Sequence, residues 1–343
     1  MFYFYKVLAW SWATADQASS SFLRGGKPAK VSGNSSDNVS GGSKTEYDPH
    51  FTDSVIAATG RGANPRLKEI MPALIRHMHD FAREVDLTVA ELMAGVEMIN
   101  EAGRMSTDRR NETQLICDIL GLESLVDEIT SKKLVPRTVV DSSSSAATPS
   151  AVLGPFYRAD APSLANGSSI ISASMLDTPW HEKAAPLLAR ISGQVRSAST
   201  NEPIADATVD IWLAGPNGMY EQQDPEQPDM NLRGRFRTDA DGRYETYALR
   251  PTAYPIPADG PAGRLLGLLD RSPYRPAHIH FIVAANGHGT LTTQIFDDDG
   301  EDVCRGGDAV FAVKKELVVK FVERKGDERA RWQLTYDFLL RAA

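Results

Sequence analysis

Cysteine is scarce in this 343-residue chain, which contains only Cys117 and Cys304. Two cysteines cannot build a disulfide framework and match no zinc-finger spacing, so a reducing compartment is expected. A basic stripe is also missing, since 37 basic and 45 acidic residues give a formal net charge of −8 without clustered Lys or Arg. This balance argues against nucleic acid as a partner and favours small molecules.

Long hydrophobic runs are missing as well. The apolar start, residues 1–17, is too short to cross a bilayer and is interrupted by Lys6. Secretion is an alternative if residues 1–15 are a signal peptide, because ATA offers a small-residue cleavage site, but the charged n-region is lacking. We therefore expect a cytoplasmic protein with no membrane partner.

Composition divides the chain into four regions. Residues 1–50 include a stretch rich in Gly, Ser and Asn, which predicts a disordered extension. In residues 51–138 apolar side chains recur every three to four positions, as in Ile70, Leu74 and Met78, which predicts helices. Residues 139–150 have the Ser, Ala and Pro composition of a linker before the last region, residues 151–343.

Helix ends are marked within residues 51–138. Thr88 and Glu91 form a capping box, and either Asp108 or Asn111 suits the cap of the next helix. Gly121 would end that helix, and a short helix is expected after it.

Residues 151–343 show a period of two typical of strands. Runs such as ATVDIWLAG, AHIHFIVAA and TLTTQIF alternate apolar and polar side chains, and Asp241-Gly242 predicts a hairpin. Many short strands without helical periods between them favour an antiparallel sandwich or barrel. The expected fold class is therefore α+β, a helical N-terminal domain followed by an antiparallel β-sandwich.

The pair His278 and His280 lies in one of these strands, YRPAHIHFIV. Side chains two apart on a strand point the same way, so both imidazoles can converge on one ion. His77 and His79 have the same spacing on a predicted helix, where side chains two apart face away from each other. By itself the strand pair also suits two histidines satisfied by hydrogen bonds at a sheet edge.

Two tyrosines stand in loops that a packing tyrosine would not prefer. Tyr220 ends GPNGMY directly after a strand, and Tyr254 lies in RPTAYPIP between prolines that fix the backbone. Either one taken separately suits an ordinary half-buried aromatic residue.

Several longer stretches resemble the intradiol ring-cleaving dioxygenases, the family of catechol and hydroxyquinol 1,2-dioxygenases. The resemblance runs from about residue 60 to about residue 340 and is carried, in the family's order, by LGPFYRADAP, VDIWLAGPNGMYEQQDPEQPDMNLRGRFRTDADGRY, YPIPADGP, YRPAHIHFIV and LTTQIFDDD. It implies a homodimer through an N-terminal helical dimerisation domain, and a catalytic β-sandwich. It also implies one non-haem Fe(III) per chain, bound by Tyr220, Tyr254, His278 and His280. Hard Fe(III) favours such phenolate oxygens.

The same resemblance implies a reaction in which an aromatic diol and O₂ give a muconate-type diacid. Tyr254 would be the ligand that the diol displaces, and it would accept one diol proton. The fixed charge of Arg275 would stabilise negative charge on the ring, and Gln294 could orient a ligand histidine. A surface arginine and a strand glutamine without a role are the simpler interpretations of the last two residues.

The choice of diol depends on the residues that would touch the ring. YPIPADGP and ICDILGLESLVDEI resemble hydroxyquinol enzymes more than simple catechol enzymes. In an apolar slot Asp118 could accept a hydrogen bond from a third hydroxyl, although a solvent-exposed helix carboxylate is the alternative. The expected ring contacts are Leu115, Asp118, Leu153, Gly154, Phe156, Ile256 and Pro257.

Three other functions stay open from the sequence. A catechol 1,2-dioxygenase would use the same iron site. A transthyretin-like β-sandwich that only binds a small aromatic or a partner would pack the same tyrosines and histidines in its core. A zinc hydrolase built on His278 and His280 lacks an obvious third ligand and general base at motif spacing.

Overall fold

A computed structural model of the chain describes residues 48–133, 147–298, 307–327 and 329–343. The predicted extension at residues 1–50, apart from its last three residues, most of the predicted linker and Cys304 lie outside the described residues. Internal contacts divide the chain into two compact units, residues 1–98 and 99–343, which are described separately. The predicted boundary at residues 139–150 stays a prediction. In the described ranges, no helix combines the length and apolarity needed to span a bilayer.

The first unit is helical, as predicted. It contains α2 (Phe51–Ala57), α3 (Pro65–Glu84) and the first part of α4 (Val89–Met105). The capping box before α4 is confirmed, because the Glu91 amide donates to Thr88 Oγ1 at 3.3 Å and the Thr88 amide donates to Glu91 Oε2 at 2.9 Å.

The predicted contrast between the two histidine pairs holds on α3. His77 is exposed, whereas His79 is half-buried, stacks on Phe51 and lies 3.0 Å from Thr52 Oγ1 through its Nδ1 atom. These two side chains do not gather into a site.

The second unit opens with helices that end as the sequence predicts. Asn111 caps α5 (Glu112–Ile119) by accepting from the Gln114 amide at 3.0 Å, which selects it over Asp108. Gly121, with a φ of +70°, separates α5 from α6 (Leu122–Lys133). Five further pieces were not predicted, namely α7 (Pro179–Ala184), α8 (Pro261–Leu268) and the 3₁₀ turns η1 (Ala173–Met175), η2 (Ala185–Leu187) and η3 (Lys315–Leu317).

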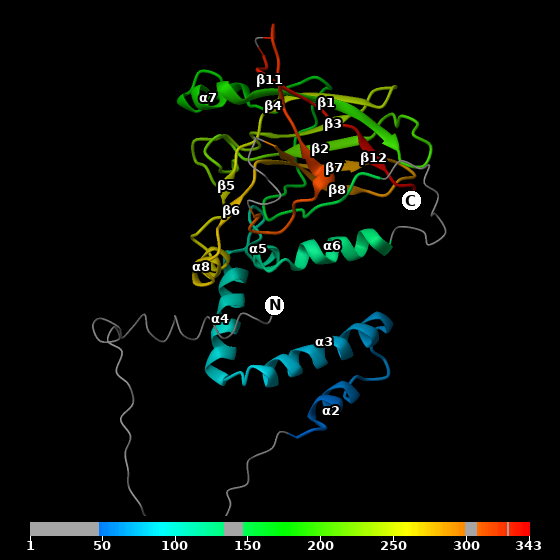
Figure 1. Ribbon diagram of the computed structural model, residues 1–343, viewed down its shortest axis with the longest axis vertical. Helices are drawn as coiled ribbons and strands as arrows, with labels where there is room; N and C mark the ends of the chain where they lie inside the picture. The colour runs from blue at the N-terminus through cyan, green and yellow to red at the C-terminus, as the bar shows by residue number, and fades with distance from the viewer. Residues whose placement is uncertain (1–47, 134–146, 299–306, 328) are drawn as a thin grey trace, which may run out of the picture. The chain divides into compact units, whose positions relative to one another are not determined.

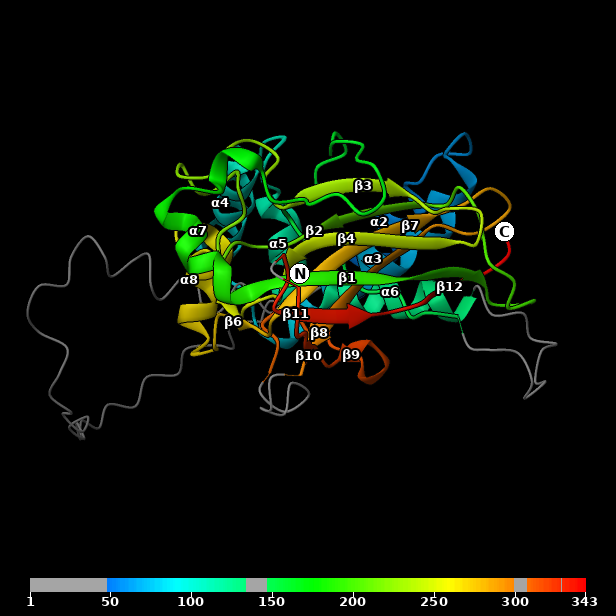
Figure 2. The same cartoon turned by 90° about the horizontal axis from the view of Figure 1, so that it is seen from above.

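The first sheet is built around β1 (Leu188–Ser197). β4 (Arg243–Leu249) pairs with it antiparallel, whereas β11 (Trp332–Thr335) and β12 (Phe338–Leu340) pair with it parallel, one after the other. β10 (Val322–Glu323) pairs with β11. Figure 2 shows β4, β1 and β11 as neighbouring strands. The parallel pairs are a departure from the purely antiparallel sheet that the alternation predicts.

The second sheet has the order β3-β2-β7-β8-β9. Its strands are β3 (Arg233–Arg237), β2 (Thr208–Trp212), β7 (His278–Ala284), β8 (Leu291–Asp297) and, after the 3₁₀ turn η3 (Lys315–Leu317), β9 (Val318–Val319). Ile191 and Val195 of the first sheet share one buried core with Ile211 and Phe281 of the second. The two sheets therefore enclose a common core, and the predicted order of a helical region followed by a sheet-rich domain is confirmed (Figure 1).

The predicted hairpin at Asp241-Gly242 is wrong. The turn is present, with a φ of +71° at Gly242 and its amide donating to the Asp239 carbonyl at 3.0 Å. However, β3 pairs with β2 and β4 pairs with β1, so the turn carries the chain from one sheet to the other. Alternation reports which face of a strand is buried and not which strand lies beside it, and a sandwich offers two sheets that satisfy the same pattern.

Candidate active site

The strand β7 presents His278 and His280 to one side of the second sheet. In register, His280 lies opposite Trp212 of β2 and Gln294 of β8. The rings of Trp212 and His280 are stacked, with centroids 4.8 Å apart. Both histidines are only 2% exposed, and their ring centroids lie 4.9 Å apart. The two imidazoles that the period of two predicted to share a face do share it.

Two loops bring the tyrosines to these histidines. Tyr220 follows β2, and Tyr254 lies in the short strand β5 (Tyr254–Pro255), which pairs with β6 (Tyr274–Arg275). The Tyr220 and Tyr254 hydroxyl oxygens are 2.9 Å apart, and the Tyr254 oxygen is 3.2 Å from His278 Nε2. Three candidate donor atoms therefore converge within hydrogen-bond distance. Gly218 permits this approach, since a Cβ there would come within 2.6 Å of Tyr254 Cβ.

The histidines are held neutral. His278 Nδ1 lies 2.7 Å from the Pro276 carbonyl, so this nitrogen carries the hydrogen and donates it, and the Nε2 lone pair is left for another partner. Burial, then the Arg275 charge, lowers the pKa of His278 to about 3. Burial, then His278, lowers the pKa of His280 well below its usual range. Neutral imidazoles with an oriented lone pair are what a metal requires.

The tyrosines are held protonated. Burial raises the pKa of Tyr220 well above its usual range, with Tyr254 adding to the effect, and burial also raises the pKa of Tyr254. Two phenol oxygens beside two neutral imidazoles suit a hard, highly charged cation, because such an ion lowers the pKa of the acids that coordinate it.

Arg275 is buried beside this cluster, with 4% exposure. Its Nη2 atom donates to Gln294 Oε1 at 2.8 Å, and its Nη1 atom lies 3.0 Å from His278 Nε2. Gln294 in turn donates to the Val152 carbonyl at 2.7 Å. The hydrogen bonds of the Gln294 side chain therefore go to Arg275 and the Val152 carbonyl, which differs from the histidine-orienting role expected for it.

A narrow cavity joins these residues to the predicted ring contacts. Its lining includes Tyr220, Tyr254, Arg275 and His280, together with every predicted ring contact except Leu153. Leu153 packs instead against the aromatic cluster around Tyr220. Pro155 and Val310 also line the cavity and were not predicted. Pro155 lies within LGPFYRADAP, whereas Val310 lies in a stretch without a periodic pattern.

Gly154 brings the backbone close to a histidine in this cavity. A Cβ at this position would lie 3.1 Å from His280 Cε1, and its φ of +78° is one that side chains rarely adopt. A glycine is therefore required here for both reasons.

Asp118 is a buried carboxyl on the cavity wall, and it forms no ion pair among the described residues. It is 1% exposed, and its Oδ1 atom has no hydrogen-bond partner among the described residues. Burial, then a hydrogen bond and charge from Glu123, raises the pKa of Asp118 to about 10. Asp118 is therefore the protonated member of its hydrogen bond with Glu123.

Glu123 keeps its charge beside Asp118. Burial acts to raise its pKa, but hydrogen bonds from Asp118, from Gln114 Nε2 at 2.9 Å and from the Leu153 amide at 2.7 Å lower it overall. Of the two neighbouring acids, Asp118 therefore holds the proton.

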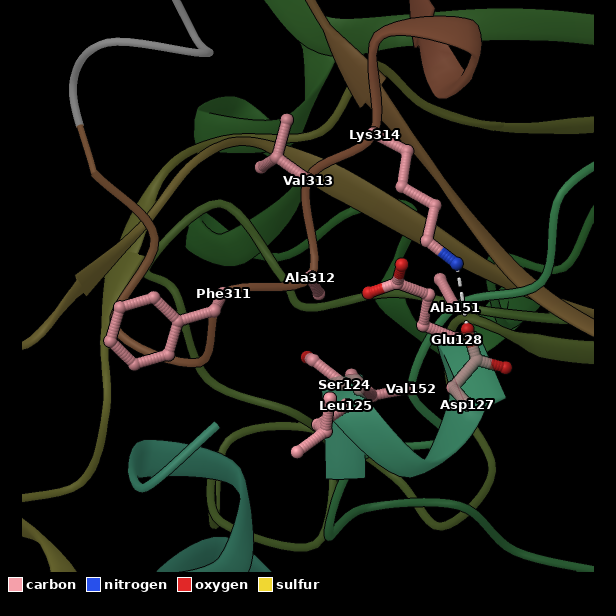
Figure 3. A pocket seen from close by; sticks show the side chains of 10 residues that line it. All are labelled: Ser124, Leu125, Asp127, Glu128, Ala151, Val152, Phe311, Ala312, Val313 and Lys314. Atoms are coloured by element: carbon pink, nitrogen blue, oxygen red, sulfur yellow. Dashed lines mark hydrogen bonds and ion pairs between the residues drawn. The ribbon is translucent and has the colours of Figure 1, made fainter. Parts of the chain in front are cut away.

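A wider hollow of about 530 Å³ lies elsewhere, along α6 and residues 311–314. Figure 3 shows Phe311 on one side of this hollow and Lys314 on the other. Lys314 Nζ already donates to Asp127 Oδ2 at 2.7 Å and to the Ser150 carbonyl at 2.6 Å. The lining of this hollow includes none of the predicted ligands or ring contacts, so the hollow is not the candidate active site although it is larger than the cavity beside Tyr220.

The zinc alternative finds no support in the described residues. Within them, no group of three or more His, Cys, Asp or Glu side chains is placed to hold a metal ion. A zinc site usually needs three such protein ligands.

Comparisons with known proteins agree with this layout. Residues 64–135 match the family profile Catechol dioxygenase N terminus, and residues 154–342 match the profile Dioxygenase. The chain is 44% identical over 293 residues to the intradiol ring-cleavage dioxygenase prcA of Aspergillus niger, covering 85% of this chain and 87% of that protein.

A second relative and a solved structure extend the comparison. Catechol 1,2-dioxygenase of Candida albicans is 42% identical over 298 residues, covering 84% of this chain and 91% of that protein. The crystal structure of hydroxyquinol 1,2-dioxygenase from Pseudomonas putida superposes with a TM-score of 0.68 at 34% identity, covering 85% of this chain and 97% of that chain. The chain therefore belongs to the intradiol ring-cleavage dioxygenases, a family of enzymes.

Proposed function

We propose that the enzyme binds one ferric ion per chain through Tyr220, Tyr254, His278 and His280. The Tyr254 oxygen lies 2.9 Å from the Tyr220 oxygen and 3.2 Å from His278 Nε2, in a buried site with neutral imidazoles, and this convergence supports the set. When bound, the ion would supply a Lewis-acid centre that holds a deprotonated diol and prepares it for O₂.

The protein's own residues would handle protons and charge. Burial raises the pKa of Tyr254, so its phenolate is a strong base and can accept one proton from the incoming diol. Arg275 is oriented beside the ligands and would stabilise negative charge that develops on the ring. Gln294 would hold Arg275 in place through its Oε1 atom.

The metal assignment is tested by two ligand variants. Tyr220→Phe and His280→Ala should each lose iron and the visible tyrosinate band together, because the remaining donors no longer match the geometry. Tyr274→Phe and His77→Ala change exposed residues of the same types and serve as controls that keep both. A ligand variant with full iron content and an unchanged band contradicts the assignment.

The preferred substrate we propose is hydroxyquinol, the 1,2,4-triol, over catechol. The observation that carries this choice is the buried Oδ1 atom of Asp118 on the cavity wall, which lacks a partner among the described residues. A third ring hydroxyl would donate to it, whereas catechol would leave it unsatisfied at a cost of about 1 to 3 kcal/mol. Names of the relatives do not decide, since both substrates occur among them.

Steady-state kinetics on both diols test the substrate. We expect the kcat/KM for hydroxyquinol to exceed that for catechol by about tenfold to a hundredfold. A wild-type preference for catechol would identify a catechol 1,2-dioxygenase and leave the iron site unaffected.

We also propose a homodimer formed through the N-terminal helices. Leu67, Ile70, Leu74 and Met78 of α3 are 38 to 50% exposed, an apolar row that a second chain would cover. Sedimentation of the wild type and of Ile70→Asp/Leu74→Asp tests this, since only the variant should be monomeric. A cytoplasmic location stays a prediction from the sequence.

A further inference from the structure

A carboxylate that the sequence did not point to holds Arg275 from the side. Asp308 is buried, and its Oδ1 atom accepts from Arg275 Nε at 3.0 Å while its Oδ2 atom accepts from Nη2 at 3.2 Å. This side-on pair uses two parallel bonds, the arrangement that restricts a guanidinium most.

The remaining guanidinium nitrogen of Arg275, Nη1, faces the proposed ligand His278. Nη2 is shared between Asp308 and Gln294 Oε1, whereas Nη1 lies 3.0 Å from His278 Nε2. Because Nε and Nη2 are bound to oxygen acceptors, Nη1 is the nitrogen directed at His278, beside the cavity that Arg275 lines.

Asp308 is itself fixed by the backbone. Its Oδ1 atom accepts from the Val310 amide at 3.2 Å, and its Oδ2 atom accepts from the Ala312 amide at 3.1 Å. Each carboxylate oxygen therefore receives one guanidinium hydrogen and one backbone hydrogen. The turn so formed places Val310 on the wall of the cavity that Arg275 also lines.

We propose that Asp308 is a positioning residue for Arg275, one that aims Nη1 at the reacting ring and fixes the Val310 wall. The proposal rests on the role proposed above for Arg275. A buried guanidinium without this carboxylate would lose two directed bonds and turn toward other acceptors. A displacement of about 1 Å at a positioning contact can lower a rate by about a hundredfold.

Asp308→Asn is the first test, on the iron-loaded enzyme. It keeps the volume and removes the charge, so kcat should fall by about tenfold to a hundredfold while KM changes by less than about threefold. Iron content and the visible band should not change, because the hydrogen bonds of the Asp308 carboxylate go to Arg275 and two backbone amides and to none of the proposed ligands.

Asp210→Asn is the matched control. Asp210 is also a buried carboxyl paired with an arginine, since its Oδ2 atom accepts from Arg235 Nη2 at 2.7 Å, and it does not line the cavity. Its kcat should stay within about threefold of the wild type.

A double-mutant cycle with Arg275→Met separates positioning from general structure. In the Arg275→Met background, Asp308→Asn should change kcat by less than about threefold, because its effect passes through the arginine. The same loss in both backgrounds would overturn the proposal, and so would an Asp308→Asn enzyme with wild-type kcat.

Thermal unfolding of the metal-free protein gives a readout independent of iron. Asp308→Asn should lower Tm in the wild type, where it leaves Arg275 unpaired, and raise Tm in the Arg275→Met background, where it removes an unpaired charge. A decrease of equal size in both backgrounds would count against the pairing. If Asp308→Asn alone does not fold, recovery of folded protein on adding Arg275→Met supports the pairing, and no recovery overturns it.

The two levels of failure can be told apart. If Arg275→Met keeps full kcat, the role of Arg275 is wrong and the positioning role falls with it. If Arg275→Met loses kcat and Asp308→Asn does not, only the positioning role is wrong.

Discussion

Two buried carboxyls near Arg275 are in opposite charge states. Asp308 is paired with the guanidinium and two backbone amides, which lower its pKa although burial alone would raise it. Asp118 is also buried but is hydrogen-bonded to Glu123, and its pKa is raised to about 10. Burial therefore does not decide the charge of either group, whereas the partner does.

The difference separates two tasks within one site. A charged Asp308 holds a cation in a fixed direction, and a neutral Asp118 offers an acceptor oxygen without adding charge beside the cavity. A second buried anion there would oppose an anionic diolate, so the neutral form of Asp118 suits the proposed substrate.

The largest effect should come from removing the Arg275 cation. Arg275→Met is expected to lower kcat by about a hundredfold to a thousandfold, because charge on the ring loses its stabilising partner. The visible band should remain, since the side chain is not a proposed ligand. Stopped-flow and absorption measurements on the iron-loaded variant check both, and a colourless variant would mean that Arg275 supports the metal itself.

A smaller effect should distinguish the neutral acid from a charged one. Asp118→Ala should reduce the kcat/KM for hydroxyquinol by about tenfold to a hundredfold and leave that for catechol nearly unchanged. Asp118→Asn should stay within about threefold of the wild type on hydroxyquinol, because its amide keeps both a donor for Glu123 and an acceptor oxygen. If Asp118→Asn lowers the kcat/KM for hydroxyquinol as much as Asp118→Ala does, Asp118 acts through a negative charge. The contrast with Asp308 would then be wrong.

A further prediction concerns the pH dependence of stability in the metal-free protein. The folded-state pKa of Asp118, about 10, lies above the ordinary value of 3.8, so the folded protein holds an extra proton between these values. Its contribution is complete below pH 3.8 and is lost as pH rises toward 10, by at most about 1.4 kcal/mol per pH unit.

Denaturant titrations at pH 6 and pH 9 measure this contribution. The free energy of unfolding should fall more steeply with pH in the wild type than in Asp118→Asn. Asp308 contributes with the opposite sign, because its lowered pKa gives stability that is lost as pH falls. Asp308→Asn should therefore change the slope of stability against pH on the acid side alone. Equal slopes in wild type and Asp118→Asn would show that Asp118 is ionised when folded.

Sequence reasoning worked best where a short period fixes geometry. The spacing of His278 and His280 on a strand, the Thr88 capping box and the Asn111 cap each depend on neighbouring residues, and each is present in the structure. The tyrosines required more, since only the resemblance to a family indicated that loops far apart in sequence meet.

What could not be predicted depends on long-range placement. Asp308 carries no local signal, because its significance comes from Arg275, 33 residues away. The turn at Asp241-Gly242 was recognised, but its strands belong to different sheets. α8 interrupts a region expected to hold only strands, and its eight residues pack beside α5 within the second unit (Figure 1).

The pairing of β1 has a consequence for how the catalytic domain folds. β1 finds β11 and β12 roughly 140 residues further along the chain, so the first sheet cannot be completed until a very long loop has closed. Contacts of such sequence separation make folding slow. During synthesis, β1 can pair with β4 before β11 and β12 exist, so its other edge has unpaired backbone groups. An unpaired strand edge is a template for aggregation. Heterologous expression at reduced temperature should therefore raise the yield of folded enzyme more than changes made near the proposed iron site.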